Sequence, residues 1–166
     1  MTVLENLMII PAQQKGEIVW NNFIKIGTVK KQERAIKEKA LNVLQFMELI
    51  ELKDEYAGNL SGGQKKLLEL AKTLMAEPKL VLLDEPGAGV NPTLMKKLVN
   101  KIKKLRAEQG LTFFLIEHDM DLVMNLCNPV IVMSEGKKLS EGTPEHIKND
   151  KGVLDAYLGG QYGNNN

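Results

Sequence analysis

Three short apolar runs in the second half of the chain most constrain its fold. They are 79-KLVLL-83, 112-TFFLI-116 and 129-PVIVM-133. The first two are separated by a helix-length segment, residues 92–108, which Gly110 closes. Continuous apolar runs of about five residues are typical of strands buried on both faces of a parallel sheet. Strand, helix and strand in this order predict a parallel α/β unit.

The first half is predicted to be helical. The opening TVLENLMII is amphipathic and is stopped by Pro11, and residues 12–29 are weakly patterned. From Lys30 to Met47, apolar residues recur three and four apart, which is the helix period. After the interruption ELKDEYAGN, a helix is expected over residues 62–76, before Pro78.

Turn and capping signals organise the C-terminal end. Gly136 in SEGKK favours a hairpin turn into 138-KLSEG-142. Thr143, followed by Pro144 and an acid, predicts a helix start. The last helix is expected through VLDAYL, followed by GGQYGNNN as a frayed tail.

Composition predicts a soluble globular protein, with 43% hydrophobic and 26% charged residues. A net charge of +1 does not predict nucleic acid or an anionic membrane as a partner. Cys127 is the single cysteine, which excludes an internal disulfide and fits a reducing compartment. No apolar run reaches the ~20 residues of a membrane span, and no signal-peptide pattern opens the chain. These patterns predict a cytoplasmic protein.

The helix expected over residues 62–76 is preceded by Ser61 and starts with Gly62, Gly63 and Gln64. Ser61 and Gln64 have the spacing of a capping box, which is a sufficient structural reason for both. Two glycines in a first helical turn need another reason, because each costs ~1 kcal/mol relative to alanine. They let a bulky group approach the backbone, and the positive end of a helix suits a phosphate.

Two polar clusters follow predicted strands. Asp84 and Glu85 end the first strand, where they either turn the chain or form a ligand site, since ligands gather at the carboxyl ends of parallel strands. Asp84 is a candidate Mg²⁺ ligand, and Glu85 a candidate to orient or deprotonate an attacking water. His118 follows the second strand and is either structural or able to contact a phosphate or steer that water. His146 lies in a predicted surface helix.

The order of these motifs resembles the ATP-binding-cassette ATPases: LSGGQ, then LVLLDEP, then GAGVNP, then a strand ending in EHD. The stretches 86-PGAGVNPTL-94 and 139-LSEGTPEHIKNDKGVLDAYLGG-160 resemble most the ATPase subunits of branched-chain amino acid importers. TVLENLMI resembles the segment after that family's glutamine loop. The resemblance implies the C-terminal part of a P-loop NTPase nucleotide-binding domain: a helical subdomain over residues 1–76 and part of a RecA-like α/β core over residues 77–166.

The resemblance also implies roles for the matching residues. The stretch 61-SGGQ-64 matches the signature motif, which in the family contacts the γ-phosphate of ATP on the opposing subunit. Asp84 matches the Walker B ligand of Mg²⁺, Glu85 the catalytic base and His118 the switch histidine. Asn91 matches the D-loop at the dimer interface, where many members carry aspartate and the branched-chain subfamily often has asparagine.

The family's phosphate-binding loop, G-x-x-x-x-G-K-[ST], is not found around any of the 14 glycines. Gly136 is followed by lysine, but the residue five positions before it is Ile131. We therefore expect the chain to correspond to the C-terminal two-thirds of a nucleotide-binding domain, beginning past the glutamine loop. By resemblance, the absent strand lies centrally in the sheet, so exposed apolar strand surface and poor solubility are expected.

The function implied by the resemblance is that of an ATPase subunit of an ABC transporter. The resemblance also implies that the transporter imports branched-chain amino acids. ATP and Mg²⁺ are the implied cofactors. A second ATPase subunit and transmembrane permease subunits are the implied partners, without nucleic acid, and the location is peripheral on the inner face of the cell membrane. We expect the 166-residue chain alone neither to bind ATP tightly nor to hydrolyse it.

Other functions stay open at this stage. One is a non-catalytic or truncated cassette that supplies only its signature motif to a partner. Another is an ABC ATPase that acts on DNA or ribosomes rather than in transport, although the chain has neither long coiled coils nor a second cassette. Within transporters, lipopolysaccharide exporters and importers of amides or urea are related, because substrate choice lies in other subunits.

Overall fold

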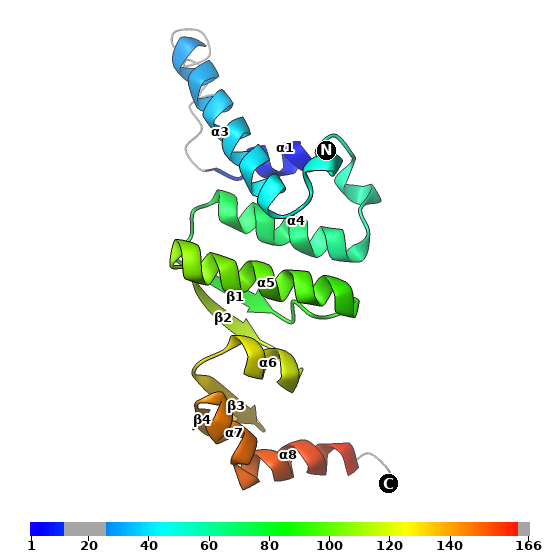
Figure 1. Ribbon diagram of the computed structural model, residues 1–166, viewed down its shortest axis with the longest axis vertical. Coiled ribbons are helices and arrows are strands. Elements are labelled where there is room, and N and C mark those ends of the chain that lie inside the picture. The colour runs from blue at the N-terminus through cyan, green and yellow to red at the C-terminus, as the bar shows by residue number, and fades with distance from the viewer. Residues whose placement is uncertain (12–25, 163–166) are drawn as a thin grey trace. The chain divides into compact units, whose positions relative to one another are not determined.

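The computed structural model describes residues 1–11 and 26–162, and Figure 1 shows the helices and strands in chain order. The chain divides by packing into two compact units, Met1–Phe114 and Leu115–Asn166. Each unit is described by itself. The division into a helical part, 1–76, and an α/β part, 77–166, concerns function rather than packing and stays a prediction.

The first unit begins with three packed helices: α1 (Val3–Met8), α3 (Ile26–Phe46) and α4 (Gly62–Met75). Helix α1 packs against both α3 and α4, and α3 packs against α4. The three helices predicted from apolar spacing are thus confirmed, although α3 begins earlier than Lys30. Residues 12–25 of the weakly patterned stretch lie outside the described residues.

Backbone hydrogen bonds tie the N-terminal segment to the connection between α3 and α4. That connection, predicted as an interruption, contains two short 3-10 helices, Ile50–Leu52 and Ala57–Asn59. Thr2 forms an isolated antiparallel bridge with Tyr56. Thr2 also caps α1, since its hydroxyl accepts the Glu5 N–H while the Glu5 carboxylate accepts the Thr2 N–H. The start of the described chain is therefore fixed both by the bridge to Tyr56 and by the cap of α1.

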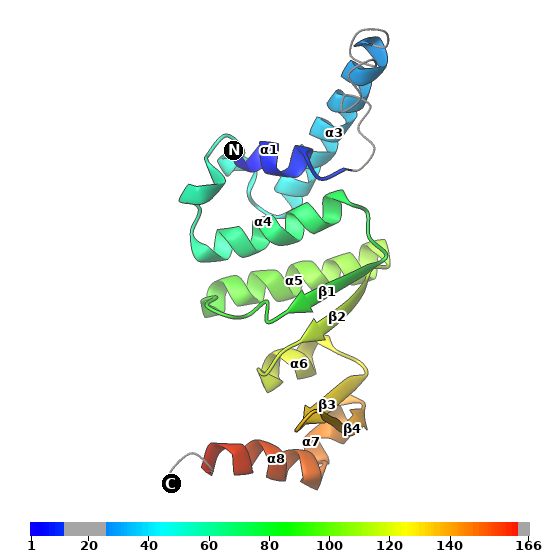
Figure 2. The ribbon, with the colours of Figure 1, turned by 180° about the vertical axis from the view of Figure 1, so that it is seen from behind.

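The first unit continues with β1 (Leu80–Asp84), α5 (Pro92–Gln109) and the beginning of β2 (Thr112–Ile116), whose last two residues are assigned to the second unit. Strand β1 pairs with β2. The Thr112 N–H donates to the Lys79 carbonyl at 3.0 Å, so the two strands start side by side. Their arrows point the same way in Figures 1 and 2, which makes the pair parallel with α5 as the crossover helix. Gly110 ends α5 with a left-handed φ of 66°. The predicted strand–helix–strand unit is confirmed.

The expectation that the first strand is buried on both faces is wrong for the described structure. Val81 is 2% exposed, but Leu82 beside it is 70% exposed. Elements of the described chain cover only one face of the β1–β2 pair, so burial alternates along the strand. Leu80, Phe114 and Ile116 are exposed as well, which confirms the predicted exposed apolar strand surface.

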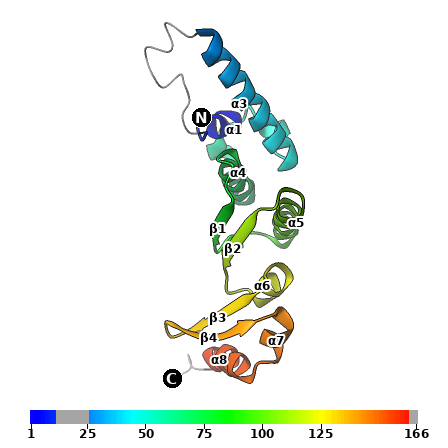
Figure 3. The same cartoon turned by 90° about the vertical axis from the view of Figure 1, so that its left-hand side faces the viewer.

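The second unit contains a hairpin covered by helices. Its elements are α6 (Met120–Leu126), β3 (Val130–Ser134), β4 (Lys137–Gly142), α7 (Pro144–Asn149) and α8 (Lys151–Tyr162). Figure 3 shows β3 and β4 running side by side, and they pair antiparallel. The turn residues Glu135 and Gly136 have φ of 47° and 74°, as a two-residue type I′ turn requires. The predicted hairpin is confirmed.

A small core holds this second unit together. Its buried members are Val130, Ile147 and Val153, and the half-buried side chains packed on them are Met120, Val123, Met124, Cys127 and Val132. Cys127 therefore has a packing role in this core. The sequence also predicts the start of α7, where the Thr143 hydroxyl accepts the His146 N–H at 3.3 Å.

The expected frayed tail is partly wrong. Helix α8 continues past VLDAYL through Tyr162. Glycine lowers helix propensity by about 1 kcal/mol but does not by itself end a helix. The last four residues, 163–166, lie outside the described residues.

The two faces of the β1–β2 unit provide a matched test of this packing. Leu105 of α5 is fully buried, whereas Leu82 of β1 is 70% exposed. We expect Leu105→Ala to lower the free energy of unfolding by about 2–5 kcal/mol, because it leaves a cavity. Leu82→Ala is expected to change it by less than about 0.5 kcal/mol. Urea unfolding followed by circular dichroism measures both, and equal losses would contradict the one-sided packing.

Candidate functional site

The amino end of α4 has the capping box that the sequence predicts. The Ser61 N–H donates to Gln64 Oε1 at 2.9 Å, and the Gln64 N–H donates to Ser61 Oγ at 3.4 Å. The Lys65 N–H donates to the Ser61 carbonyl. These three bonds leave the N–H groups of Gly62 and Gly63, for which no described residue provides an acceptor. Unpaired N–H groups at the positive end of a helix are the elements of an anion site.

The two glycines of this turn have different structural reasons. A Cβ on Gly63 would overlap Leu94 Cδ2, so the first turn of α5 packs directly on the backbone there. A Cβ on Gly62 would meet nothing within 4 Å. The bulky group that approaches Gly63 is therefore a leucine of the same chain, while Gly62 leaves open space in front of the helix end.

Asp84 and Glu85 lie at the carboxyl end of β1, and both side chains are exposed. Pro86, which follows, is buried and anchors the turn. Glu85 has a φ of 43°, in the left-handed region that side-chain-bearing residues rarely adopt. Its carbonyl accepts the Ala88 N–H at 3.1 Å, so the chain reverses immediately after the strand. Non-glycine residues in such conformations are concentrated at functional sites.

A small hollow of about 210 Å³ lies beside Asp84. Helix α4 contributes Lys66, Glu69 and Thr73 to its lining, and the end of β1 contributes Leu83 and Asp84. No three His, Cys, Asp or Glu side chains of residues 1–11 and 26–162 converge as metal ligands. Asp84 still suits Mg²⁺, because this ion is usually held by one or two carboxylates together with water and substrate phosphates.

Asn91 has a structural role that the sequence analysis missed. Its Oδ1 accepts the Leu94 N–H at 2.9 Å, so Asn91 is the N-cap of α5, with Pro92 in the first turn. The signal was present in the sequence as Asn followed by Pro before a helical pattern. Between Glu85 and Asn91 the loop is closed by a second turn, in which the Val90 N–H donates to the Gly87 carbonyl at 3.1 Å.

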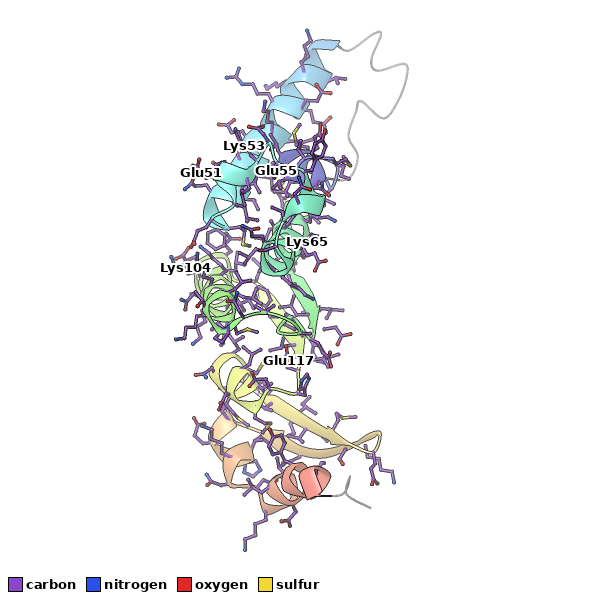
Figure 4. All side chains as sticks on the ribbon, turned by 90° about the vertical axis from the view of Figure 1, so that its right-hand side faces the viewer. Glu51, Lys53, Glu55, Lys65, Lys104 and Glu117 are labelled. Carbon is purple, nitrogen blue, oxygen red and sulfur yellow. The ribbon has the colours of Figure 1, made fainter. Side chains whose placement is uncertain are left out.

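His118 belongs to the second unit, where it directly precedes the cap of α6. Its side chain is 79% exposed, and its Nδ1 lies 3.9 Å from Glu117 Oε2. Glu117, labelled in Figure 4, has a side chain only 2% exposed, and it also accepts the His118 N–H at 3.3 Å. Asp119 then caps α6 through the Leu122 N–H. The buried carboxylate Glu117 was not singled out by the sequence analysis, although it stands between an apolar strand and a histidine.

Two family models match the chain. The model of the ABC transporter family matches residues 1–88. The model of the branched-chain amino acid ATP-binding cassette transporters matches residues 137–163. Among residues 1–11 and 26–162, each helix is too short or too polar to span a bilayer.

Relatives with printed names match over nearly the whole chain. The probable branched-chain amino acid transport ATP-binding protein LivG of Archaeoglobus fulgidus is 42% identical over 97% of this chain and 61% of its own. The high-affinity branched-chain amino acid transport ATP-binding protein BraF of Pseudomonas aeruginosa is 38% identical over 96% and 62%. This chain therefore spans less than two-thirds of the length of these relatives.

Solved structures agree. An ATP-binding cassette of an ABC transporter in its ADP conformation has a TM-score of 0.73 and 38% identity, covering 96% of this chain and 63% of that chain. A nucleotide-free ATP-binding cassette has a TM-score of 0.74 and 40% identity, covering 95% and 62%. The α/β architecture expected from the resemblance is confirmed.

The packing difference between the glycines predicts opposite effects of one substitution. Gly63→Ala is expected to lower the free energy of unfolding by about 1–3 kcal/mol, because Leu94 must move. Gly62→Ala meets open space and is expected to raise it by about 0.4–1 kcal/mol. Thermal unfolding of both variants measures this.

Adding Leu94→Ala to Gly63→Ala provides the control. Since the second change removes the clashing side chain, the double variant should lose less stability than the sum of the single losses. Additive losses would show that Leu94 does not explain the glycine at position 63.

Taken together, the family model over residues 1–88 and the shared architecture show that this chain belongs to the ABC transporter family.

Proposed function

We propose that this protein is the ATP-binding and ATP-hydrolysing subunit of an ABC transporter that energises the import of branched-chain amino acids. The substrate class is supported by the match over residues 137–163 to the branched-chain amino acid cassettes. It is supported as well by the names of relatives that are 36–42% identical. This match lies in the second unit, outside the motifs that are common to the whole family.

The amino end of α4 is the observation that most supports ATP as the ligand. Gly62 and Gly63 present two N–H groups without an acceptor among the described residues, and the space in front of Gly62 is open. With the positive end of the helix dipole, they would bind the γ-phosphate of ATP held by a second ATPase subunit. Ser61 and Gln64 would keep this turn rigid through their capping box.

The end of β1 would supply the hydrolytic groups. Asp84 would hold Mg²⁺, which neutralises charge on the phosphates when bound. Glu85, exposed next to it, would orient and deprotonate the attacking water, and His118 would contact the γ-phosphate. Asn91 would lie at the interface between the two ATPase subunits while capping α5.

The proposed partners are a second ATPase subunit and transmembrane permease subunits, with the protein peripheral on the inner face of the membrane. The alternative is a chain that supplies only its signature motif to a partner's nucleotide site. The two differ in whether Glu85 and Asp84 are needed for turnover, because a signature-only subunit would use neither carboxylate.

Replacement of the proposed base tests the hydrolytic role. We suggest a chimaera in which this chain replaces the matching part of the Archaeoglobus fulgidus relative. In that cassette, Glu85→Gln is expected to lower the ATP turnover number by about 100-fold or more while ATP binding and dimerisation persist. Glu108→Gln, an exposed carboxylate at the far end of α5, serves as control. Near-normal hydrolysis by the Glu85 variant would exclude this role.

The 166-residue chain itself has a separate expectation. It is expected to bind ATP–Mg²⁺ more weakly than millimolar, because a single helix end and one carboxylate provide few of the contacts that a triphosphate needs. Isothermal titration calorimetry of the purified chain measures this. Millimolar or tighter binding would show that the chain forms a phosphate site of its own.

A further inference from the structure

The turn at the end of α3 contains a residue that local rules disfavour. The Leu49 N–H donates to the Leu44 carbonyl at 2.9 Å, and the Glu48 N–H donates to the Gln45 carbonyl at 3.1 Å. Leu44 and Leu49 are both buried. This is a Schellman motif, whose left-handed position is usually glycine. Here that position is Glu48, with a φ of 60°.

The Glu48 side chain provides a reason for this choice. Its Oε1 accepts from Lys101 Nζ and its Oε2 from Lys97 Nζ, each at 2.8 Å. The two lysines are one turn apart on α5, so a single carboxylate engages both. Hydrogen bonds from Lys101 and then Lys97 lower the pKa of Glu48 to about 2. A glycine at this position would suit the backbone but would lose both contacts.

Lys101 is set apart from the other lysines of α5. Its side chain is only 11% exposed, and its Nζ lies 5.0 Å from the centre of the Phe46 ring, on the last turn of α3. An ammonium this close to an aromatic face is attracted by the ring. The end of α3 therefore holds Lys101 with a carboxylate and a ring together, which is more than a solvated surface pair provides.

Helix α5 thus contacts α4 and the turn at the end of α3 at two separate places. Its first turn packs Leu94 on Gly63 of α4, and its next two turns bring Lys97 and Lys101 to Glu48. Figures 1 and 2 both show α4 and α5 side by side. Since Asn91 caps α5, these contacts also place the end of the loop from Glu85 to Asn91 next to the glycines of α4.

We propose that Glu48 is a positioning residue whose ion pairs with Lys97 and Lys101 hold α5, and with it the Asn91 loop, against the glycine-bearing end of α4. Its relevance to ATP turnover depends on the proposed function, but the positioning of α5 does not. Glu48 would in this way fix the position of the Asn91 loop relative to the amino end of α4, the two parts of the proposed nucleotide-facing surface.

Hydrogen exchange of the full 166-residue chain, followed by mass spectrometry, tests the positioning without any need for ATP. Glu48→Gly and Glu48→Gln are both expected to accelerate amide exchange over residues 92–98 by about tenfold. Glu51→Gln, an exposed carboxylate labelled in Figure 4, should leave that exchange unchanged. If Glu48→Gly leaves or improves the protection of this segment, the proposal is overturned, because backbone strain rather than the ion pairs would then dominate.

A second comparison separates specific pairing from general loosening. In a Lys97→Met and Lys101→Met background, Glu48→Gly should cause no further acceleration, since its partners are already absent. Additive effects would overturn the pairing. In the chimaeric cassette, Glu48→Gly should lower ATP turnover without weakening ATP binding. Unchanged turnover with faster exchange would support the positioning and remove its link to hydrolysis.

Discussion

The burial of one face of α5 is the constraint on which the described first unit depends. Leu98, Ile102 and Leu105 are buried along this helix, and Val81 is buried on the strand that precedes it. Because α5 is also the crossover between β1 and β2, its packing determines where both strands lie. The same helix begins at the cap residue of the loop that follows Glu85, so its packing also determines where that loop ends. The core and the candidate site share one element.

The approach of α5 to the amino end of α4 does not depend on hydrophobic burial alone. At its first turn the helix needs a residue without a side chain, Gly63, to approach α4, and farther along it needs a carboxylate, Glu48, to neutralise two lysines. These contacts explain two residues that violate local preference, a glycine inside a helix and a glutamate with positive φ. Both violations are compensated by α5, which is the pattern expected when local strain serves a tertiary arrangement.

The other face of the β1–β2 pair has a different chemical character. Leu80, Leu82, Phe114 and Ile116 are exposed there, and such a row of apolar side chains on adjacent strands favours association with further polypeptide. This chain covers about 61–62% of the length of the two relatives described above. Asp84 and Glu85 follow directly from the exposed apolar residues of β1, so the candidate carboxylates and this apolar face share one strand.

The sequence by itself determined the features that depend on residues within four positions of one another. These include the capping box at Ser61 and the turn at Gly136. The order of strand, helix and strand and the family motifs were also readable from the sequence, because they follow from the order of residues along the chain. It did not reveal which residue approaches Gly63, what Glu48 contacts or which face of β1 is covered. Leu94 and Lys101 are distant in sequence from their partners, and one-sided burial depends on which elements pack around the sheet. Only the tertiary structure decided these features, because they arise from contacts between separate elements, for which local periodicity and capping rules contain no information.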